Sequence, residues 1–127
     1  MIFGTFDILH KGHLNLFDQA RKHGDFLIAV IARDRTVVKV KNREPKHNEK
    51  ERLENISEHV DKAVLGNLKD KFSAIKKYKP DVICLGYDQV AFTENIENKL
   101  KELKLKTKVT RLKAHKPYLY KSSLLRN

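Results

Sequence analysis

The chain has 127 residues, a net charge of +11 at neutral pH and a sequence isoelectric point of about 9.8. This length suits one domain with a core that needs neither disulfides nor metals, and the single cysteine, Cys84, excludes a disulfide framework within the chain. No apolar run is long enough to span a bilayer and no signal peptide precedes the first strand, so we expect a cytoplasmic protein without a membrane partner. The positive charge has two explanations: a polyanionic partner, or lysines that only keep helix faces solvated.

Five short apolar runs predict β-strands. They are MIF at residues 1–3, FLIAVIA at 26–32, KAVLG at 62–66, DVICLG at 81–86 and TKVTRL at 107–112. The first is short, and one or two further residues would normally precede Met1. FLIAVIA is continuously apolar, which is typical of a strand buried on both faces. Cys84 lies within DVICLG, where a lone thiol is expected to be a small buried apolar group without redox activity.

Amphipathic stretches between these runs predict four helices. Their apolar positions recur at helical spacing and are Leu14, Phe17 and Ala20; Leu53 and Ile56; Phe72 and Ile75; and Ile96, Leu100 and Leu103. Asn48, with Glu51 three residues later, is expected to cap the second helix. The alternation of strands and helices predicts an α/β fold, in which a doubly wound, Rossmann-like, five-stranded parallel sheet forms a single domain over residues 1–127.

Chemically informative segments follow four of the five predicted strands. They are GTFDILHKGH, ARDRT, LGYDQ and YKSS, in chain order. In a doubly wound parallel sheet, ligands bind beyond the carboxyl ends of the strands, at the point where the strand order reverses. The sequence therefore predicts one site at this edge of the sheet.

The segment GTFDILHKGH, residues 4–13, has the features of a phosphate-binding turn. Gly4 permits a tight turn, Gly12 lets a phosphate approach the backbone, and the start of the next helix adds a positive dipole end. His10 and His13 would share one face of that helix, where two imidazoles can stabilise charge on a phosphate. The alternatives are histidines packed under the sheet, histidines idle in solvent, or metal ligands, although no third ligand stands nearby at metal spacing.

On these residues the chain resembles the cytidylyltransferase-like nucleotidyltransferases, whose signature is GTFDxxHxGH and which are related to the class I aminoacyl-tRNA synthetases with HIGH motifs. ARDRTVVKVKNREP, KER, LGYDQ and YKSSLL are similar to further segments of that family, so the resemblance spans essentially the whole chain. It implies nucleotidyl transfer with release of pyrophosphate, Mg²⁺ bound with the nucleotide, no metal ligand from the protein, and a homodimer.

Within this family, ARDRTV, LGYDQ and LYKSS are most similar to segments of archaeal-type FAD synthases, which implies transfer of AMP from ATP to FMN. Phosphopantetheine adenylyltransferases usually carry threonine where this chain has His10. Glycerol-3-phosphate cytidylyltransferases share the HxGH motif, but the Arg-Thr-Glu-Gly stretch and the tryptophan that they usually carry are absent here. A cytidylyltransferase that acts on CTP and a small phosphorylated alcohol, such as glycerol 3-phosphate, is the alternative enzyme.

The resemblance implies that His10 and His13 hold the α- and β-phosphates as charge moves to the leaving group. Lys41, in the loop expected after the second strand, would reach the triphosphate and complete the catalytic set. Lys39 and Arg43 compete for this role, because an apparent insertion blurs the register. Any of the three is otherwise a solvated loop charge.

The other nucleotide-binding residues expected from the resemblance are Thr5, Phe6, Lys11, Gly12, Arg52, Asp88, Tyr120, Ser122 and Ser123. Arg52 would bind phosphate or else pair with a nearby glutamate, and Asp88 would bind the ribose or adenine or else form an ordinary turn. The two serines would hold the β- and γ-phosphates or only cap a helix. Tyr118 and Tyr120 would offer ring faces to a base or flavin or else pack on the sheet, and Asp7 is expected only to cap its turn.

The alternative from another functional class is an RNA-binding or regulatory module that has this fold but no enzymatic activity. The positive charge and the kinship with synthetases motivate it. Both histidines, Asp88 and the closing serines are present, which an abandoned active site would not require, and the sequence carries no aromatic RNA-binding motif. A nucleic-acid partner is therefore not expected.

Overall fold

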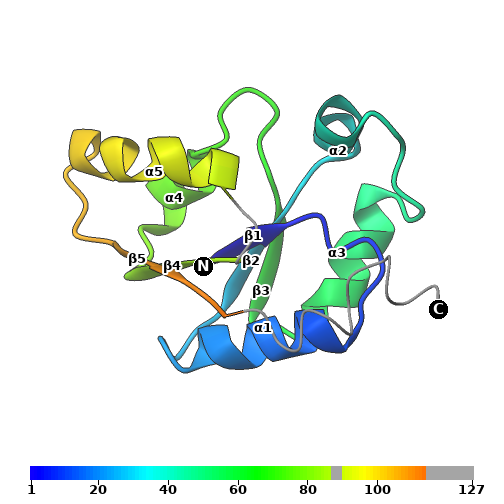
Figure 1. The fold of residues 1–127 in the computed structure, drawn as a ribbon, viewed down its shortest axis with the longest axis horizontal. Helices are drawn as coiled ribbons and strands as arrows, with labels where there is room; N and C mark the ends of the chain where they lie inside the picture. Colours follow the sequence, from blue (N-terminus) through cyan, green and yellow to red (C-terminus); the bar gives the residue numbers. More distant parts are fainter. Residues whose placement is uncertain (87–89, 114–127) are drawn as a thin grey trace.

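The computed structural model describes residues 1–86 and 90–113, apart from the side chains of residues 90–94. Within these residues strands and helices alternate along the chain (Figure 1). The elements are β1 (Ile2–Gly4), α1 (Lys11–Arg21), β2 (Ile28–Ile31), α2 (Asp34–Lys41), α3 (Glu49–Ser57), β3 (Lys62–Leu65), α4 (Ser73–Tyr78), β4 (Val82–Leu85), α5 (Val90–Glu102) and β5 (Lys108–Arg111).

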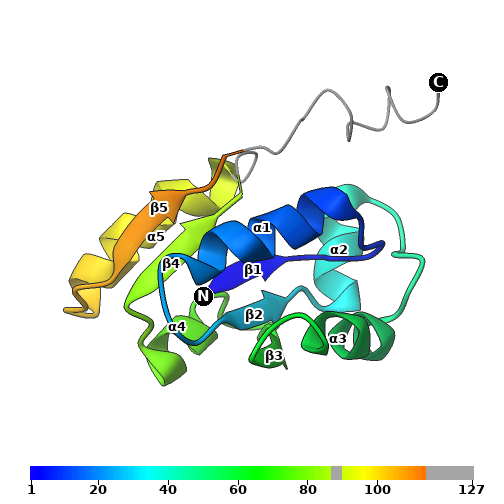
Figure 2. The same ribbon diagram turned by 90° about the horizontal axis from the view of Figure 1, so that it is seen from below.

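The five strands form one sheet in the order β3-β2-β1-β4-β5, and every neighbouring pair is parallel (Figure 2). The chain builds outward from β1 to β3 on one side and then crosses to β4 and β5 on the other. This confirms the predicted Rossmann-like, doubly wound sheet. The strand order reverses between β1 and β4, where a ligand site is expected beyond the carboxyl ends of the strands.

Helices cover both faces of the sheet and divide the core into two layers. Apolar side chains of α1 and α3 pack on one face, and those of α4 and α5 pack on the other (Figure 1). Ala29 and Ile31 of β2 face the first layer while Val30 faces the second, which explains the continuously apolar run in this strand. Cys84 is a buried member of the first layer, and burial raises the pKa of its thiol, as expected for an inert apolar group.

Residues 34–41, which the sequence analysis treated as loop, form the helix α2, so that prediction was wrong. Val37 of this helix is buried, and Asp34 in the first turn and Lys41 in the last complement the helix dipole. Asn42 ends the helix in a left-handed conformation, with a φ of 57°. A single buried apolar position in a strongly basic stretch is too weak a periodic signal to predict such a helix.

Helix α3 begins as predicted. The Asn48 side chain accepts a hydrogen bond from the N–H of Glu51 at 2.9 Å, and the Glu51 carboxylate accepts one from the N–H of Asn48 at 3.4 Å. This reciprocal cap fixes where the chain from α2 enters α3.

Among the described residues, no helix has the combined length and apolarity to cross a bilayer.

Candidate functional site

The turn after β1 has an unusual backbone. Phe6 adopts a left-handed conformation with a φ of 50°, and its ring is buried and lies against Gly4. A Cβ atom on Gly4 would lie 2.7 Å from Cζ of Phe6, which is so short that the ring or the backbone would have to shift. The expected tight turn is present, but its left-handed residue is Phe6, and Gly4 is required because the phenyl ring approaches its Cα so closely.

His10 and His13 cap the helix that they begin. The N–H of Gly12 donates to Nδ1 of His10 at 3.0 Å, and the N–H of His10 donates to Nδ1 of His13 at 3.3 Å. The two rings stack with their centroids 4.1 Å apart. Because each Nδ1 accepts a hydrogen bond, the neutral form of each ring carries its proton on Nε2 and is a donor there.

The core holds the second histidine in place through aromatic contacts. The ring of Phe6 lies 5.7 Å from the ring of His13 in an edge-on arrangement, and equally far from the ring of Phe17. His13 is half-buried, whereas His10 is exposed at the start of α1 and is therefore not packed beneath the sheet. Within the described part of the chain, no group of three or more His, Cys, Asp or Glu side chains is placed to hold a metal ion.

Asp7 does more than cap its own turn, which corrects the expectation from the sequence. Its carboxylate accepts hydrogen bonds from the N–H groups of Lys46 and His47, both at 2.8 Å. Partial burial raises the pKa of Asp7, but the two N–H groups, together with the nearby side chains of His47 and Arg52, hold the pKa below its ordinary value. The β1–α1 turn is thereby joined to the connection between α2 and α3.

Arg52 is fully buried and donates hydrogen bonds to three separate segments. Its guanidinium reaches the carbonyl of Thr5 at 2.9 Å through Nη1, the carboxylate of Asp34 at 2.7 Å through Nη2, and the carbonyl of His47 at 3.1 Å through Nε. A nearby glutamate was the alternative partner expected from the sequence. The observed carboxylate belongs instead to Asp34 on another helix, and phosphate contact by Arg52 stays a prediction.

A second group of contacts joins the ends of β2 and β3 to the start of α3. Arg33 donates to the Glu49 carboxylate at 2.7 Å and to the carbonyl of Gly66 at 2.8 Å. Glu49 also accepts from the N–H of Asp34 at 3.0 Å. The Asp34 N–H first, and then the Arg33 guanidinium, lower the pKa of the Glu49 carboxyl. These partners are 15 to 33 positions apart and were not predicted from the sequence.

The ends of β4 and β5 are joined by Arg111, which donates to the carbonyl of Gly86 at 2.7 Å. Gly86 is the last described residue before the segment that contains the predicted ligand-binding Asp88. The predicted residues Asp88, Tyr118, Tyr120, Ser122 and Ser123 all lie outside the described residues.

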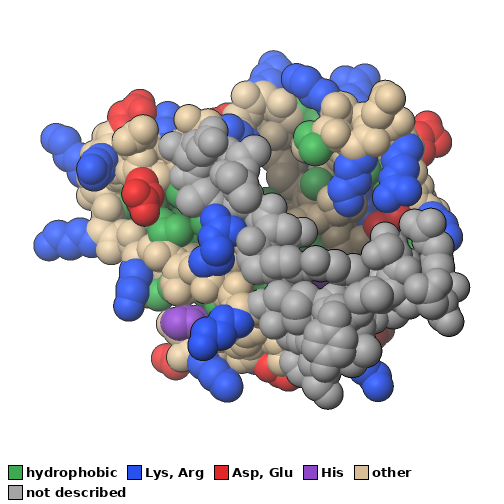
Figure 3. Space-filling view, viewed as in Figure 1, with side chains coloured by type: hydrophobic (Ala, Val, Ile, Leu, Met, Phe, Trp, Pro, Cys, Tyr) green, Lys and Arg blue, Asp and Glu red, His purple; other side chains and the backbone are tan. Residues whose placement is uncertain are grey.

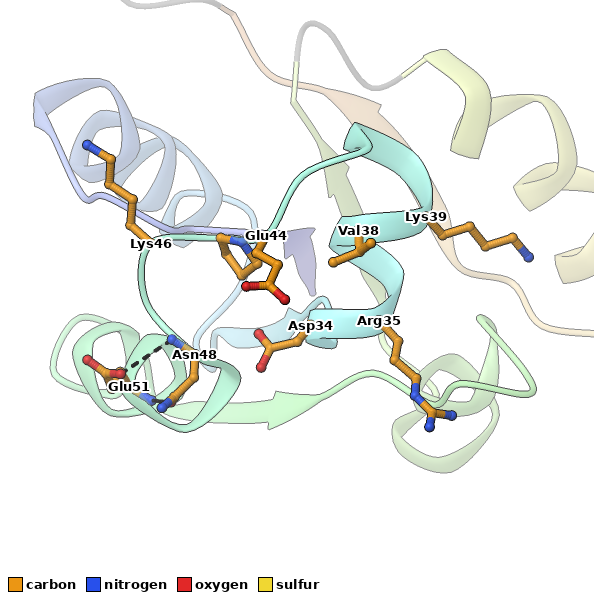
Figure 4. A pocket seen from close by; sticks show the side chains of 9 residues that line it. Asp34, Arg35, Val38, Lys39, Glu44, Lys46, Asn48 and Glu51 are labelled. Carbon is orange, nitrogen blue, oxygen red and sulfur yellow. Dashed lines mark hydrogen bonds between the residues drawn. The ribbon is translucent and has the colours of Figure 1, made fainter.

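The predicted cationic residues lie on and after α2. Lys39 and Lys41 are both exposed in the last turn of α2, and Arg43 follows the helix. Lys41 stands four positions after the buried Val37 and so starts from the same face of the helix. The side chain of Lys39 extends away from Asp34 and Glu44 (Figure 4). Lys and Arg side chains gather over α2, beside a hollow in the surface (Figure 3).

A cavity of about 540 Å³ lies between α2, the α2–α3 connection and the start of α3. Its lining residues are Asp34, Arg35, Val38, Lys39, Glu44, Pro45, Lys46, Asn48 and Glu51. The side chains of Asp34, Val38 and Glu44 point toward one another across it, whereas Lys39 and Lys46 point outward (Figure 4). The carboxylates in this lining accept hydrogen bonds. The cavity therefore suits a ligand that carries hydrogen-bond donors better than it suits a phosphate group alone.

The fold is that of a nucleotidyltransferase domain. The model of the cytidylyltransferase-like family matches residues 1–127, and the chain belongs to that family, as predicted.

Three archaeal relatives are FAD synthases. That of Methanohalophilus mahii is 45% identical over 113 residues, which cover 86% of this chain and 77% of that protein. That of Archaeoglobus profundus is 40% identical over 124 residues, or 94% and 77% of the two chains. That of Ferroglobus placidus is 38% identical over 111 residues, or 87% and 73%. The crystal structure of the lipopolysaccharide core biosynthesis protein from Thermoplasma volcanium GSS1 has a TM-score of 0.83 and 38% identity to this chain, and the match covers 91% of this chain and 95% of that one.

Proposed function

We propose that this chain is an FMN adenylyltransferase, or FAD synthase, which transfers AMP from ATP to FMN and releases pyrophosphate. One observation carries the proposal: a histidine pair caps α1 at the switch point of the sheet, in a chain 38–45% identical to three FAD synthases over most of its length. These relatives do not favour the alternative reaction of CTP with glycerol 3-phosphate.

In this reaction a phosphate oxygen of FMN attacks the α-phosphorus of ATP in line. A new P–O bond forms, and the bond from the α-phosphorus to the oxygen that bridges to the β-phosphate breaks, so pyrophosphate leaves. Such transfer requires positioning and charge neutralisation more than covalent help from the protein. Nε2–H of His10 and of His13 would donate to the α- and β-phosphates as negative charge moves onto the leaving group.

The surrounding residues would hold the nucleotide. The backbone at Thr5 and Phe6 would cradle it, Lys11 and Gly12 would lie beside the phosphates at the positive end of α1, and Lys41 would reach the triphosphate. The position of Lys41 on the face of α2 that carries the buried Val37 favours it over Lys39. Asp88, Tyr120, Ser122 and Ser123 keep the roles that the family resemblance gives them.

The cavity beside α2 suits the acceptor better than it suits the triphosphate. FMN carries ribityl hydroxyls and a ring N–H, which are donors that the carboxylates of Asp34 and Glu44 can accept. Val38 and Pro45 add apolar surface to the same cavity. We assign the ribityl-flavin portion of FMN to this cavity.

Magnesium would enter as the complex with ATP, since Mg²⁺ prefers oxygen ligands and keeps several waters. It would neutralise phosphate charge, and we assign it no protein ligand. We expect the protein to be a homodimer in the cytoplasm. Light scattering of the purified protein during gel filtration measures the oligomeric state.

The experiment that tests the activity is pyrophosphate release by the purified protein with magnesium. ATP or CTP is combined with FMN or glycerol 3-phosphate, and FAD is identified by chromatography. Release with ATP and FMN alone, lost in His10→Ala, supports the proposal. Release with CTP and glycerol 3-phosphate supports the alternative enzyme. A bound nucleotide without turnover on any pair points to the binding or regulatory module.

A further inference from the structure

We propose that Arg52 is a positioning residue that holds the β1–α1 turn in the shape required to present His10 and His13 to the triphosphate. The inference rests on the proposed function and gives this arginine a role different from phosphate binding. It starts from two observations: the side chain of Arg52 has no exposed surface, and each of its three nitrogens donates to a different segment of the chain.

The contact with Thr5 acts at the weakest point of the turn. Thr5 precedes Phe6, whose left-handed backbone is rarely adopted by a residue with a bulky side chain and persists only where its surroundings impose it. Nη1 of Arg52 holds the Thr5 carbonyl at 2.9 Å. The ring of Phe6 in turn contacts the ring of His13. A displaced carbonyl at Thr5 would therefore move the phenyl ring, and with it the imidazole.

The other two contacts join this turn to the cationic part of the site. Nη2 binds Asp34, the first residue of α2, and α2 carries Lys41 in its last turn. Nε binds the carbonyl of His47, whose own N–H is bound by Asp7 of the same β1–α1 turn. One guanidinium thus fixes the histidine turn relative to the helix that carries the lysine expected to bind the triphosphate.

The chemistry of arginine fits this role better than that of any other residue. A guanidinium is a rigid plane with donors that diverge, so it can satisfy three acceptors that lie in different directions. A lysine ammonium keeps the charge but cannot reproduce this geometry. Burial of a charged group costs folding free energy that an apolar side chain would avoid, and a fully buried guanidinium would have to leave its present partners to reach a phosphate.

The first measurement compares kcat and KM for Arg52→Lys with those for Arg21→Lys. Arg21 is a matched control, because it also donates to one carboxylate, that of Asp61, and to one carbonyl, that of His59, at the far end of α1. We expect Arg52→Lys to lower kcat by about 10²-fold while KM for ATP changes little, because misplaced donors affect the transition state most. Arg21→Lys should stay within about twofold of wild type.

The second measurement needs no substrate, so a chain inactive toward FMN still tests the positioning role. NMR signals of the imidazole C–H groups are recorded in the nucleotide-free protein and assigned by His→Gln variants. We expect Arg52→Lys to shift the signals of His10 and His13 and to leave those of His23 and His59 in place. Arg21→Lys should leave the His10 and His13 signals unchanged.

Support requires both shifted His10 and His13 signals and, in an active chain, the loss of kcat. Unmoved signals, or a raised KM for ATP with kcat kept, would show that Arg52 contacts phosphate directly or has only a structural role, and either result overturns the proposal. If Arg52→Lys does not fold, Arg52→Gln carries the same test. Glutamine leaves no charge at the buried position, and the Asp34 carboxylate that loses its ion pair is 38% exposed to solvent.

Discussion

The imidazole of His10 lies on the imidazole of His13, with the ring centroids 4.1 Å apart and the planes inclined by 27°. Both rings turn Nδ1 toward the backbone at the start of α1 and use it to accept a hydrogen bond there. The same two side chains therefore cap the helix with one nitrogen and keep a defined N–H donor on the other. Capping and the proposed catalytic role can be separated by substitutions that keep only one of them.

His10→Asn is expected to keep the cap and to lose the donor. Asparagine is a favoured N-cap residue, and its side-chain oxygen can accept from the N–H of Gly12 as Nδ1 now does. We expect kcat for FAD formation to fall by about 10²–10³-fold, the effect of one lost donor to a transition-state charge. Thermal unfolding should stay close to that of wild type.

His10→Ala is the companion variant, because alanine removes both the cap and the donor. We expect the same loss of kcat together with a loss of about 1 kcal/mol of unfolding free energy. If His10→Asn retained the wild-type kcat, Nε2 of His10 would have no part in phosphate stabilisation.

Gly4→Ala is expected to disturb both stability and activity. The new Cβ would lie 2.7 Å from Cζ of Phe6, and a shift of this buried ring would disturb its contacts with His13 and Phe17. Overpacking of this kind costs about 1–3 kcal/mol. Urea unfolding measures the loss, and kcat should fall with it.

Gly24→Ala is the matched control for this substitution, because a Cβ on Gly24 would meet nothing within 4 Å. We expect its stability to be unchanged or raised by up to about 1 kcal/mol, since alanine restricts the unfolded chain. Equal losses in both variants would contradict the role of the phenyl ring.

Local patterns in the sequence were enough to predict the sheet and the beginning of its site. Continuous apolar runs such as that of β2 mark strands buried on both faces, and the asparagine and glutamate at the start of α3 mark its cap, so both were confirmed. The histidine pair after β1 was also visible, because its spacing and its glycine are local features. The reciprocal capping by the Nδ1 atoms could not be predicted from the sequence, because it depends on the orientation of the two rings.

Contacts between distant segments could not be predicted from one sequence. Asp7 meets the backbone at positions 46 and 47, and Arg52 meets Asp34 and Thr5, only because parallel strands bring their carboxyl ends together. Because Arg52 stands next to glutamates on its own helix, the sequence suggested a pair within that helix. It gave no sign of partners in other segments. The cavity beside α2 was not predicted either, because residues 34–41 were expected to form a loop and not a helix.

Lys41→Ala is expected to weaken ATP binding, and Lys39→Ala is the control from the same helical turn. Lys41 shares its helix face with the buried Val37, whereas the side chain of Lys39 extends away from Asp34 and Glu44 on another face of the helix. Loss of one charge-assisted contact to the triphosphate should raise KM for ATP about tenfold or more. The reverse ranking would assign the triphosphate contact to Lys39, and equal small effects would leave Arg43 as the remaining candidate.

Glu44→Gln is expected to raise KM for FMN and to leave KM for ATP unchanged. The carboxylate of Glu44 points into the cavity assigned to the ribityl-flavin portion, opposite Asp34 and Val38 (Figure 4). The amide oxygen of glutamine accepts a hydrogen bond from a ribityl hydroxyl more weakly than a carboxylate does. This loss should raise KM for FMN by about threefold to tenfold. An effect on ATP alone would place the triphosphate, and not the flavin, in this cavity.

The stability of the α2–α3 junction is expected to depend on pH through Glu49. The Asp34 N–H and the Arg33 guanidinium lower its pKa from the ordinary value of 4.5 in the folded chain. A group whose folded-state pKa is lowered stabilises the fold fully above its unfolded pKa, and this contribution is lost as the pH falls through the folded-state pKa. Glu49→Gln should therefore unfold at a lower temperature than wild type near pH 7.

The difference in unfolding temperature between wild type and Glu49→Gln is expected to be constant above about pH 5.5, to shrink as the pH falls below about 4.5, and to vanish below the folded-state pKa. Glu54→Gln, at an exposed position of the same helix, should differ little from wild type across this range. Scanning calorimetry between pH 3 and pH 7 measures all three proteins. A difference that persisted unchanged to pH 3 would mean that Glu49 stabilises the junction through packing, because a protonated carboxyl no longer forms the ion pair with Arg33.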